Sequence, residues 1–394
     1  MMHVKIATWL ADHSIPRMLA DGTDWSNGGF AERLDWAGRP LDPGFKRLRV
    51  TARQIYAFSH LGLGGSKEAV RAAEHGMEFL LTKARLGGGE FASRLTTRGD
   101  PLDTTTDLYD LAFVLFALAW WYKLTGEEDA LSVAEDTLRF VRRKLGHPSG
   151  RGFLHRENAR APYQQNPHMH LLEAAIFLAA FSGRELFYVL AREIFELAVS
   201  DFFDPRTETL AEYYGDNWKR DAGSDPIVVE PGHHFEWCWL LTRYSALMGE
   251  RSALHVAERL FWFGRKHGFD SSSGLIYDAV DPSGRCLKAD FRSWPNLEYV
   301  KAMIAMSETY PGDSRFAADQ LDEAIERIFS FFLGQGNIGG VSVPPGLWLD
   351  HICAADFSAK VDHIPASTFY HLAFAFTEVT RHRAGRHIFS GAPW

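Results

Sequence analysis

Residues 107–121 read DLYDLAFVLFALAWW, a stretch in which nearly every side chain beyond the first turn is apolar. A helix on the surface of a protein carries its apolar residues on one stripe, whereas a helix that is apolar all round is buried. This stretch therefore predicts a helix that is enclosed on most sides. Such a helix belongs to the interior of a larger helical assembly.

Apolar residues at helical spacing recur along the whole chain. Such one-sided patterns are typical of helices that pack on a core and leave their other side in water. The clearest are Leu186, Leu190, Ile194 and Leu197, and Leu321, Ile325, Ile328 and Phe332. About twelve helical segments are predicted in this way. They begin near residues 3, 43, 66, 107, 129, 169, 185, 231, 251, 294, 314 and 366.

The number of helices indicates the architecture. Twelve helices leave roughly 65 residues for each antiparallel pair, which favours a repeated arrangement. We expect an all-α fold with six apolar inner helices in a closed ring inside six outer helices, and an open helical solenoid is the alternative. Loops at 87–94, 151–158 and 273–284 predict short strands or hairpins. No linker divides the chain, so residues 1–394 are predicted to form one domain.

Composition argues against several classes of protein. The net charge of −8 argues against a nucleic-acid-binding surface. No uninterrupted apolar run reaches the roughly 18–20 residues of a membrane span. The N-terminus has no signal-peptide pattern, so a cytoplasmic location is expected. Cys238, Cys286 and Cys353 are odd in number and far apart, which fits neither a disulfide framework nor a zinc site.

The 17 histidines gather at the starts of predicted apolar helices. In EPGHHFEWCWLL (230–241), His233 and Glu236 are three residues apart, so both project from one face of the first turn. A carboxylate near an imidazole holds its tautomer and raises its pKa, which general acid–base chemistry requires. The other two clusters are QNPHMHLLEAA (165–175) and PASTFYHLAFAF (365–376).

His168 and His170 of the first cluster face different ways on a helix, because they are two residues apart. We expect His170 to face a shared cavity, with Glu173 one turn later. A single histidine on an apolar helix is more often a hydrogen-bonded structural residue. Three clusters at helix starts make a shared site as credible as that interpretation.

A metal site is the rival functional interpretation. The sequence has no HExxH and no compact carboxylate–histidine spacing, so we predict no metal and no cofactor, although distant His and Glu residues are compatible with one. GLGGSK at 62–67 lacks the spacing of a phosphate-binding loop, and no G-x-S-x-G motif occurs.

Several polar residues stand among aromatic ones, as Arg53 does, and as Arg292 does beside Trp294. Either arginine alone is more often a structural ion-pair partner, and tryptophan is more often part of the core. Aromatic faces beside hydrogen-bonding groups are also how proteins hold a sugar ring.

Six segments, in their order and spacing, resemble the N-acylglucosamine 2-epimerase superfamily. They are RQIYAF (53–58), DLYDLAF (107–113), NPHMHLLEA (166–174), PGHHFEW (231–237), RSWPNLE (292–298) and PASTFYH (365–371). The resemblance covers essentially the whole chain. It implies an (α/α)6 barrel, in agreement with the predicted double ring, and a sugar 2-epimerase or aldose–ketose isomerase that works without a metal.

NPHMHLLEA and PASTFYH look most like the mannose isomerase branch of that superfamily. This branch interconverts mannose and fructose, and related members act on lyxose or sulfoquinovose. KVDHIPASTFYH (360–371) lacks the Trp-Lys pattern of the cellobiose 2-epimerase branch, which leaves the N-acylglucosamine epimerase branch as the nearer alternative. Some isomerases carry two adjacent tryptophans where this chain has Ser293–Trp294, so one wall of the sugar pocket differs.

The resemblance also implies roles for individual residues. His233 and His371 match the acid–base pair, and Glu236 matches the carboxylate that orients the first histidine. The remaining matches are to residues that line the sugar pocket, and the one to Asp362 rests only on its distance from His371. They are Arg53, Tyr109, Asn166, His170, Trp294, Glu298 and Asp362.

The expected function is therefore an isomerase that interconverts an unphosphorylated aldose and ketose through a cis-enediol. The alternatives are a sugar 2-epimerase and, from another class, a glycan hydrolase or a non-catalytic sugar-binding module. A hydrolase requires two carboxylates about 5–10 Å apart across the substrate, and it would give the histidine clusters no role. The expected partner is a monosaccharide, with no nucleic acid and no membrane, and the chain is expected to be a monomer or a homodimer.

Overall fold

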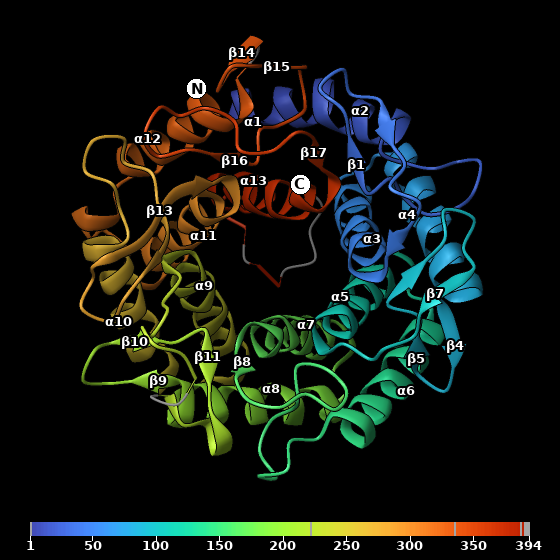
Figure 1. Ribbon diagram of the computed structural model, residues 1–394, viewed down its shortest axis with the longest axis horizontal. Helices are drawn as coiled ribbons and strands as arrows, with labels where there is room; N and C mark the ends of the chain where they lie inside the picture. Colours follow the sequence, from blue (N-terminus) through green and yellow to red (C-terminus); the bar gives the residue numbers. More distant parts are fainter. Residues whose placement is uncertain (1, 221–222, 335, 387, 390–394) are drawn as a thin grey trace.

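A computed structural model describes residues 2–220, 223–334, 336–386 and 388–389. Its helices form two concentric rings, an inner one and an outer one (Figure 1). The chain runs around these rings once, alternating between an outer and an inner helix. The predicted all-α double ring, an (α/α)6 barrel, is confirmed.

The inner ring consists of the helices that bury most of their side chains. Each inner helix contacts the next, and α13 contacts α3, so the ring is closed and the solenoid alternative is wrong. The amide Nε2 of Gln54 donates to the carbonyl of Ala366 (2.7 Å), which ties the two ends of the ring together. The inner helices are α3 (Leu48–Leu63), α5 (Leu108–Thr125), α7 (Asn166–Ser182), α9 (Pro231–Met248), α11 (Ser293–Thr309) and α13 (Phe369–Arg383).

The outer ring covers the inner one with amphipathic helices. They are α4 (Lys67–Phe79), α6 (Glu128–Leu145), α8 (Glu185–Leu197), α10 (Ser252–His267) and α12 (Ala318–Ile328). The sixth outer position, against α13, is filled by α1 (Met2–Thr8), a π-helical segment (Trp9–Ser14) and α2 (Ile15–Ala20). Further π-helical turns follow α4, α8 and α12 at Leu80–Ala84, Ala198–Phe202 and Phe329–Leu333.

Burial separates the two rings as their sequence patterns predict. Almost every side chain of α5 from Leu108 to Trp121 is buried, whereas α12 buries one stripe that includes Leu321, Ile325 and Ile328. By length and composition α5 alone among the described helices could cross a membrane, and 72% of it is enclosed by the structure, as expected of an inner helix. The predicted helix starts agree within a few residues, except that α3 begins at Leu48 because Lys46–Arg47 pairs as a strand.

The connections differ at the two ends of the barrel. Inner helices lead to outer ones by short turns, such as those after α5 and α7, where Gly126 (φ 75°) and Gly183 (φ 68°) adopt the left-handed conformation that ends a helix. The return connections, from an outer helix to the next inner one, are long and contain all the described strands. These connections therefore lie at the end where the inner helices begin.

The strands form small antiparallel sheets of two or three strands. The hairpins predicted at 87–94 and 273–284 are confirmed as β4–β5 and β12–β13, whereas 151–158 forms only isolated bridges to single residues, because no continuous partner lies beside it. The strands are β1 (Arg33–Leu34), β2 (Pro40–Leu41), β3 (Lys46–Arg47), β4 (Arg85–Gly87), β5 (Glu90–Phe91), β6 (Arg94–Leu95), β7 (Pro101–Asp103), β8 (Tyr163–Gln164), β9 (Phe203–Asp204), β10 (Thr209–Leu210), β11 (Tyr213–Tyr214), β12 (Tyr277–Val280), β13 (Cys286–Arg292), β14 (Gly336–Ile338), β15 (Val341–Val343), β16 (His351–Ile352) and β17 (Ile364–Pro365).

Close packing between the rings generates a prediction about stability. A Cβ on Gly76 of α4 would lie 2.4 Å from the ring of Phe30 and 2.8 Å from Ile55, and both neighbours are buried. We expect Gly76→Ala to lower the free energy of unfolding by about 1–3 kcal/mol through overpacking, despite the better helix propensity of alanine. Urea unfolding measures this, with Glu74→Ala on the exposed face of α4 as a control. A stabilised Gly76→Ala protein would contradict the packing.

Candidate active site

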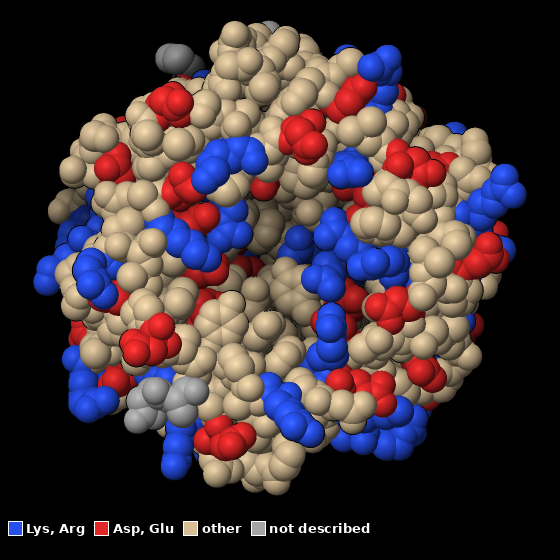
Figure 2. Space-filling model, in the orientation of Figure 1, with Lys and Arg blue, Asp and Glu red and all other residues tan. Residues whose placement is uncertain are grey.

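The first turns of the inner helices surround a cavity of about 320 Å³. Figure 2 shows the molecule hollowed at the centre of the face seen in Figure 1, with basic and acidic side chains around the rim. All six inner helices begin at this end, so the positive ends of their dipoles point toward the cavity. The lining residues are Arg53, Tyr109, Gln164, Asn166, His170, Glu212, Tyr213, Glu230, His233, Glu236, Arg292, Trp294, Asp350, Pro365, Ser367, Thr368 and His371.

Most of the predicted site residues lie in this lining, but Glu298 and Asp362 do not. Glu298 is fully buried behind His371, where it acts through that histidine. Asp362 is a correction, because its side chain is 93% exposed and its carboxylate contacts the adjacent His363. Only sequence distance linked Asp362 to His371, and the chain between them leads from the surface loop through β17 into the barrel.

His233 in the first turn of α9 is held by carboxylates from the loop before its helix. Its Nδ1 lies 2.9 Å from Oε1 of Glu212 and 3.6 Å from Oε2 of Glu230. Burial alone would lower the pKa of His233, but these two carboxylates raise it to about 9. His233 is therefore an imidazolium at neutral pH, with Nε2 left to act as an acid.

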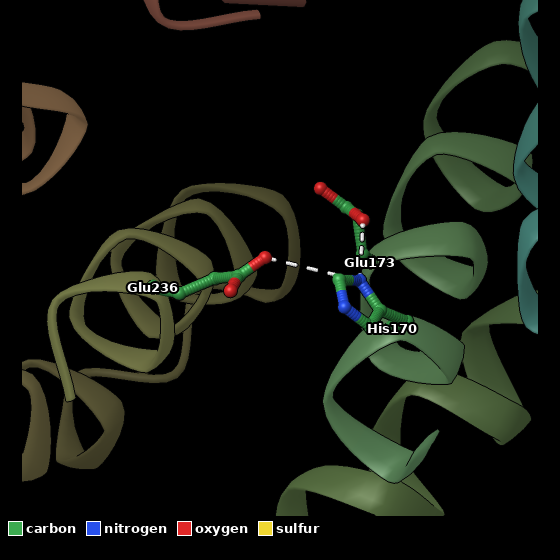
Figure 3. A group of neighbouring side chains, drawn as sticks. All are labelled: His170, Glu173 and Glu236. Atoms are coloured by element: carbon green, nitrogen blue, oxygen red, sulfur yellow. Dashed lines mark hydrogen bonds and ion pairs between the residues drawn. The ribbon is translucent and has the colours of Figure 1, made fainter. Parts of the chain in front are cut away.

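Glu236 does not hold His233 in the predicted way. The three-residue spacing brought both side chains to the cavity, but the nearest imidazole to Glu236 is His170, with 3.8 Å between Oε1 and Nδ1. His170 also contacts Glu173 (3.1 Å), as Figure 3 shows, so His170 rather than His168 faces the site as expected. Burial, followed by the charge of Glu298, raises the pKa of Glu236 well above its usual range, which favours the protonated form that can donate a hydrogen bond.

His371 in the first turn of α13 has the opposite electrostatic setting. Its Nδ1 lies 2.8 Å from Oε1 of Glu298, and Oε2 of Glu298 lies 2.8 Å from the ammonium of Lys301. Burial lowers the pKa of His371 to about 4 despite the hydrogen bond to Glu298. Burial opposes ionisation of Glu298, but Lys301 and His371 lower its pKa to about 2. His371 is therefore a neutral imidazole whose Nε2 is available as a base.

Trp294 lies between these two histidines. Its ring centre is 4.9 Å from that of His233 and 5.7 Å from that of His371. Gly232 permits this arrangement, because a Cβ there would lie 2.6 Å from the indole. The preceding Ser293 is buried and donates to Asp350 (3.0 Å), which also accepts from Thr368. Ser293 thus holds the carboxylate of Asp350 in the lining of the cavity.

The opposite wall of the cavity comes from α3 and α5. Arg53 donates to the hydroxyl of Tyr109 (2.5 Å), and its guanidinium lies over the ring of Phe113. Arg53 forms no ion pair with a described carboxylate. Its charge therefore remains available to an oxygen in the cavity.

Sequence reasoning missed several residues that complete the site. Glu212 and Asp350 come from irregular loops, where no periodic pattern assigns a direction to a side chain. Glu230 carried a usable signal, because it immediately precedes the first turn of α9, three residues before His233. Lys301 was hidden because a lysine in the middle of an apolar helix is ordinarily expected to reach solvent.

Among the described residues, three groups of histidine and glutamate side chains place nitrogen and oxygen atoms close enough together to bind one metal ion. They are His170, Glu173 and Glu236; Glu212, Glu230 and His233; and Glu236, Glu298 and His371. In each group, Nδ1 of the histidine already forms a hydrogen bond with a carboxylate, and an ion bound at Nδ1 would have to replace that bond. The prediction that no metal is needed stays a prediction, and chelation tests it.

The chain is similar to known sugar isomerases and epimerases. The family model "N-acylglucosamine 2-epimerase (GlcNAc 2-epimerase)" matches residues 28–375. A Mannose-6-phosphate isomerase of Rhizobium meliloti is 32% identical, over 95% of this chain and 96% of its own. A Cellobiose 2-epimerase of Bacteroides fragilis is 22% identical, over 76% and 79%. A crystal structure of a D-mannose isomerase superposes with a TM-score of 0.84 at 20% identity, covering 96% of this chain and 97% of that one.

The pairing of His233 with Glu212 can be tested directly. Replacement by the neutral Glu212→Gln keeps the side-chain shape but removes the carboxylate, so we expect the pKa of His233 to fall from about 9 toward its ordinary 6.5. NMR titration of labelled histidine side chains measures this, with the exposed Glu250→Gln as a control. An unchanged titration in Glu212→Gln would show that another group charges His233.

Proposed function

The chain belongs to the N-acylglucosamine 2-epimerase family and is an enzyme of the isomerase class, and we propose that it interconverts an unphosphorylated aldose and its ketose. D-mannose and D-fructose are the proposed pair, with D-lyxose and D-xylulose as a related one. The similarity to the mannose isomerase sequences and structure supports this assignment. The proposed enzyme is cytoplasmic, monomeric or homodimeric, and requires no metal.

One observation carries the proposal: the cavity holds a charged imidazole and a neutral one on either side of Trp294. Isomerisation requires an acid and a base at the same time, because a C–H next to a carbonyl is a weak acid. His371 is set up as the base by its neutral charge state. His233 is set up as the acid by its proton.

The chemistry follows from these charge states. After ring opening, Nε2 of His371 removes the proton from C2, the C–H electron pair forms the C1–C2 double bond, and the carbonyl oxygen O1 takes a proton from His233. The product is a neutral cis-enediol. His371 then returns its proton to C1 while His233 recovers one from the O2 hydroxyl, which yields the ketose and restores both histidines.

Other residues stabilise the oxygen on which negative charge develops. Donors aimed at such an oxygen in a water-poor site contribute strongly to catalysis. Arg53 and the protonated Glu236 supply donors, and the first turns of the inner helices add a positive field. Trp294 offers a flat surface for the apolar face of a sugar.

The charges of the cavity favour a sugar without a phosphate. Carboxyl groups in the lining outnumber the guanidinium groups, and Arg292 is already paired with Asp278 (2.6 Å) and Glu230 (3.5 Å). A phosphate dianion would face the carboxylates of Glu212 and Asp350. Because the Rhizobium relative is named a Mannose-6-phosphate isomerase, mannose 6-phosphate must be included among the tested substrates.

The second candidate is a 2-epimerase acting on a free or N-acylated sugar. Similarity to the cellobiose epimerase and the matching family model favour it. It shares the enediol, but the proton returns to the opposite face of C2 rather than to C1. The products therefore differ: a ketose from the isomerase and a C2-epimeric aldose from the epimerase.

Proton NMR in D2O with EDTA distinguishes these functions. The substrates are mannose, lyxose, N-acetylglucosamine and mannose 6-phosphate. We expect fructose from mannose, with deuterium incorporated and no loss of rate from chelation. Formation of an epimeric aldose alone would favour the second candidate, faster turnover of mannose 6-phosphate would overturn the unphosphorylated substrate, and inhibition by EDTA would overturn metal independence.

Replacement of the base should remove catalysis without removing the fold. We expect His371→Asn to lower kcat for isomerisation by roughly 10²–10⁴-fold or more, because general base catalysis is lost. Deuterium exchange into the sugar should fall in parallel. Circular dichroism and thermal unfolding check the fold, and substantial turnover by folded His371→Asn would contradict the assignment.

The two histidines also predict the pH profile. A base must be unprotonated, so activity should be lost as pH falls through about 4, the pKa of His371. An acid must be protonated, so activity should be lost as pH rises through about 9, the pKa of His233. We expect kcat/KM to form a broad plateau between these values, and Glu212→Gln should move the alkaline limb to lower pH. A narrow optimum that Glu212→Gln leaves in place would contradict the assignment.

A further inference from the structure

Lys301 is a buried cation that the proposed reaction does not use. It lies on α11 one turn after Glu298, and its side chain is 0% exposed. Its ammonium is 2.8 Å from Oε2 of Glu298 and lies over the rings of Trp239 (4.5 Å) and Phe374 (4.3 Å). Removing a charge from water costs free energy, so a lysine at this depth stays charged only beside a group of opposite charge.

The surroundings of Lys301 contain more carboxyl groups than cations. Besides the carboxylate of Glu298, the carboxyl groups of Glu173 on α7 and Glu236 on α9 belong to the same cluster. The uncharged groups around the cluster are His170 on α7, Tyr370 and His371 on α13, and Tyr56 on α3. The other cations that act on it are Arg53 and His233. Lys301 is therefore the cation that compensates the carboxylate behind His371.

The carboxylate nearest to His233, that of Glu212, lacks such compensation, whereas the more distant Glu230 is paired with Arg292 (3.5 Å). Among the described residues, Glu212 forms an ion pair with His233 and with no lysine or arginine. The carboxylate behind His233 therefore obtains its counter-charge from the imidazole, whereas the carboxylate behind His371 obtains it from Lys301. Two similar Glu–His pairs thus differ in where the positive charge is located.

We propose that Lys301 is a positioning residue that compensates the carboxylate of Glu298, and that it thereby extends to lower pH the range over which His371 is an uncharged base. The assignment rests on the proposed function for its catalytic meaning. The ammonium of Lys301 supplies the positive charge beside Glu298. Without it, Glu298 would favour a protonated, positively charged His371. Glu298 then accepts a hydrogen bond from Nδ1 of a neutral imidazole and directs Nε2 to the substrate.

The test replaces Lys301 with methionine, which has a similar length and no charge. We expect Lys301→Met to raise the pKa of His371, so that the acid limb of kcat/KM shifts to higher pH by roughly one to two units. NMR titration of labelled histidines should show the same shift for His371, with the signal assigned through His371→Asn. The alkaline limb, which belongs to His233, should stay in place.

Lys46→Met is the matched control. Lys46 is another buried lysine, 4% exposed, with an ion pair of 2.8 Å to Asp24, and it does not line the active-site cavity. This substitution should lower the melting temperature in the same way as Lys301→Met but leave both limbs of the profile unchanged. Reduced activity of Lys301→Met with an unshifted His371 titration would overturn the proposal and leave Lys301 a structural residue.

Two further measurements cover a variant that does not fold and a protein that turns over none of the sugars. If Lys301→Met does not fold, the wild-type protein at pH 7 should still show a charged Lys301 ammonium and a neutral His371 by NMR, and a neutral Lys301 or a charged His371 would overturn the proposal. If the wild-type protein turns over none of the sugars, the proposed function fails, but the titration of His371 in Lys301→Met still tests the inference.

Discussion

The carboxylate behind each imidazole is the interaction on which the site depends. A histidine buried without a partner loses its charge, and a histidine beside an uncompensated carboxylate keeps it. The barrel uses both outcomes within one cavity: Glu212 and Glu230 keep His233 charged, whereas Glu298 holds His371 without charging it. Acid and base are thus specified by residues that need not touch a substrate.

The double ring exists to bring these pairs together. Short turns join inner to outer helices at one end, so every inner helix begins at the other end, where the long loops lie. Each inner helix then contributes a side chain from its first turns to one cavity, and Arg53, Tyr109 and His170 meet His233, Trp294 and His371 there. The outer helices cover the inner ring. Both imidazoles are therefore buried, and the charged groups around each one decide its charge state.

Periodicity predicted the rings well, because a helix that is apolar all round and a helix with one apolar stripe bury different amounts of surface. His233 and His371 were found because they stand at helix starts. Their partners were harder to find: Glu236 has the right helical spacing but meets His170, whereas Glu212 reaches His233 from an irregular loop. Asp362 failed because proximity in sequence fixes no direction in space. The sequence predicts which side chains share a face of one helix, but contacts between helices and loops across the barrel depend on tertiary packing.

Closure of the ring has a consequence for biosynthesis. The contact of α13 with α3 joins segments separated by more than 300 residues, as in the hydrogen bond between Gln54 and Ala366. The flank of α3 that packs on α13 therefore stays unpartnered until α13 has left the ribosome, and contacts this distant in sequence form slowly. His371 arrives on that same last helix. The nascent chain consequently gains its proposed catalytic base and the contact that closes the ring on one helix, and a translation product that stops before α13 has neither.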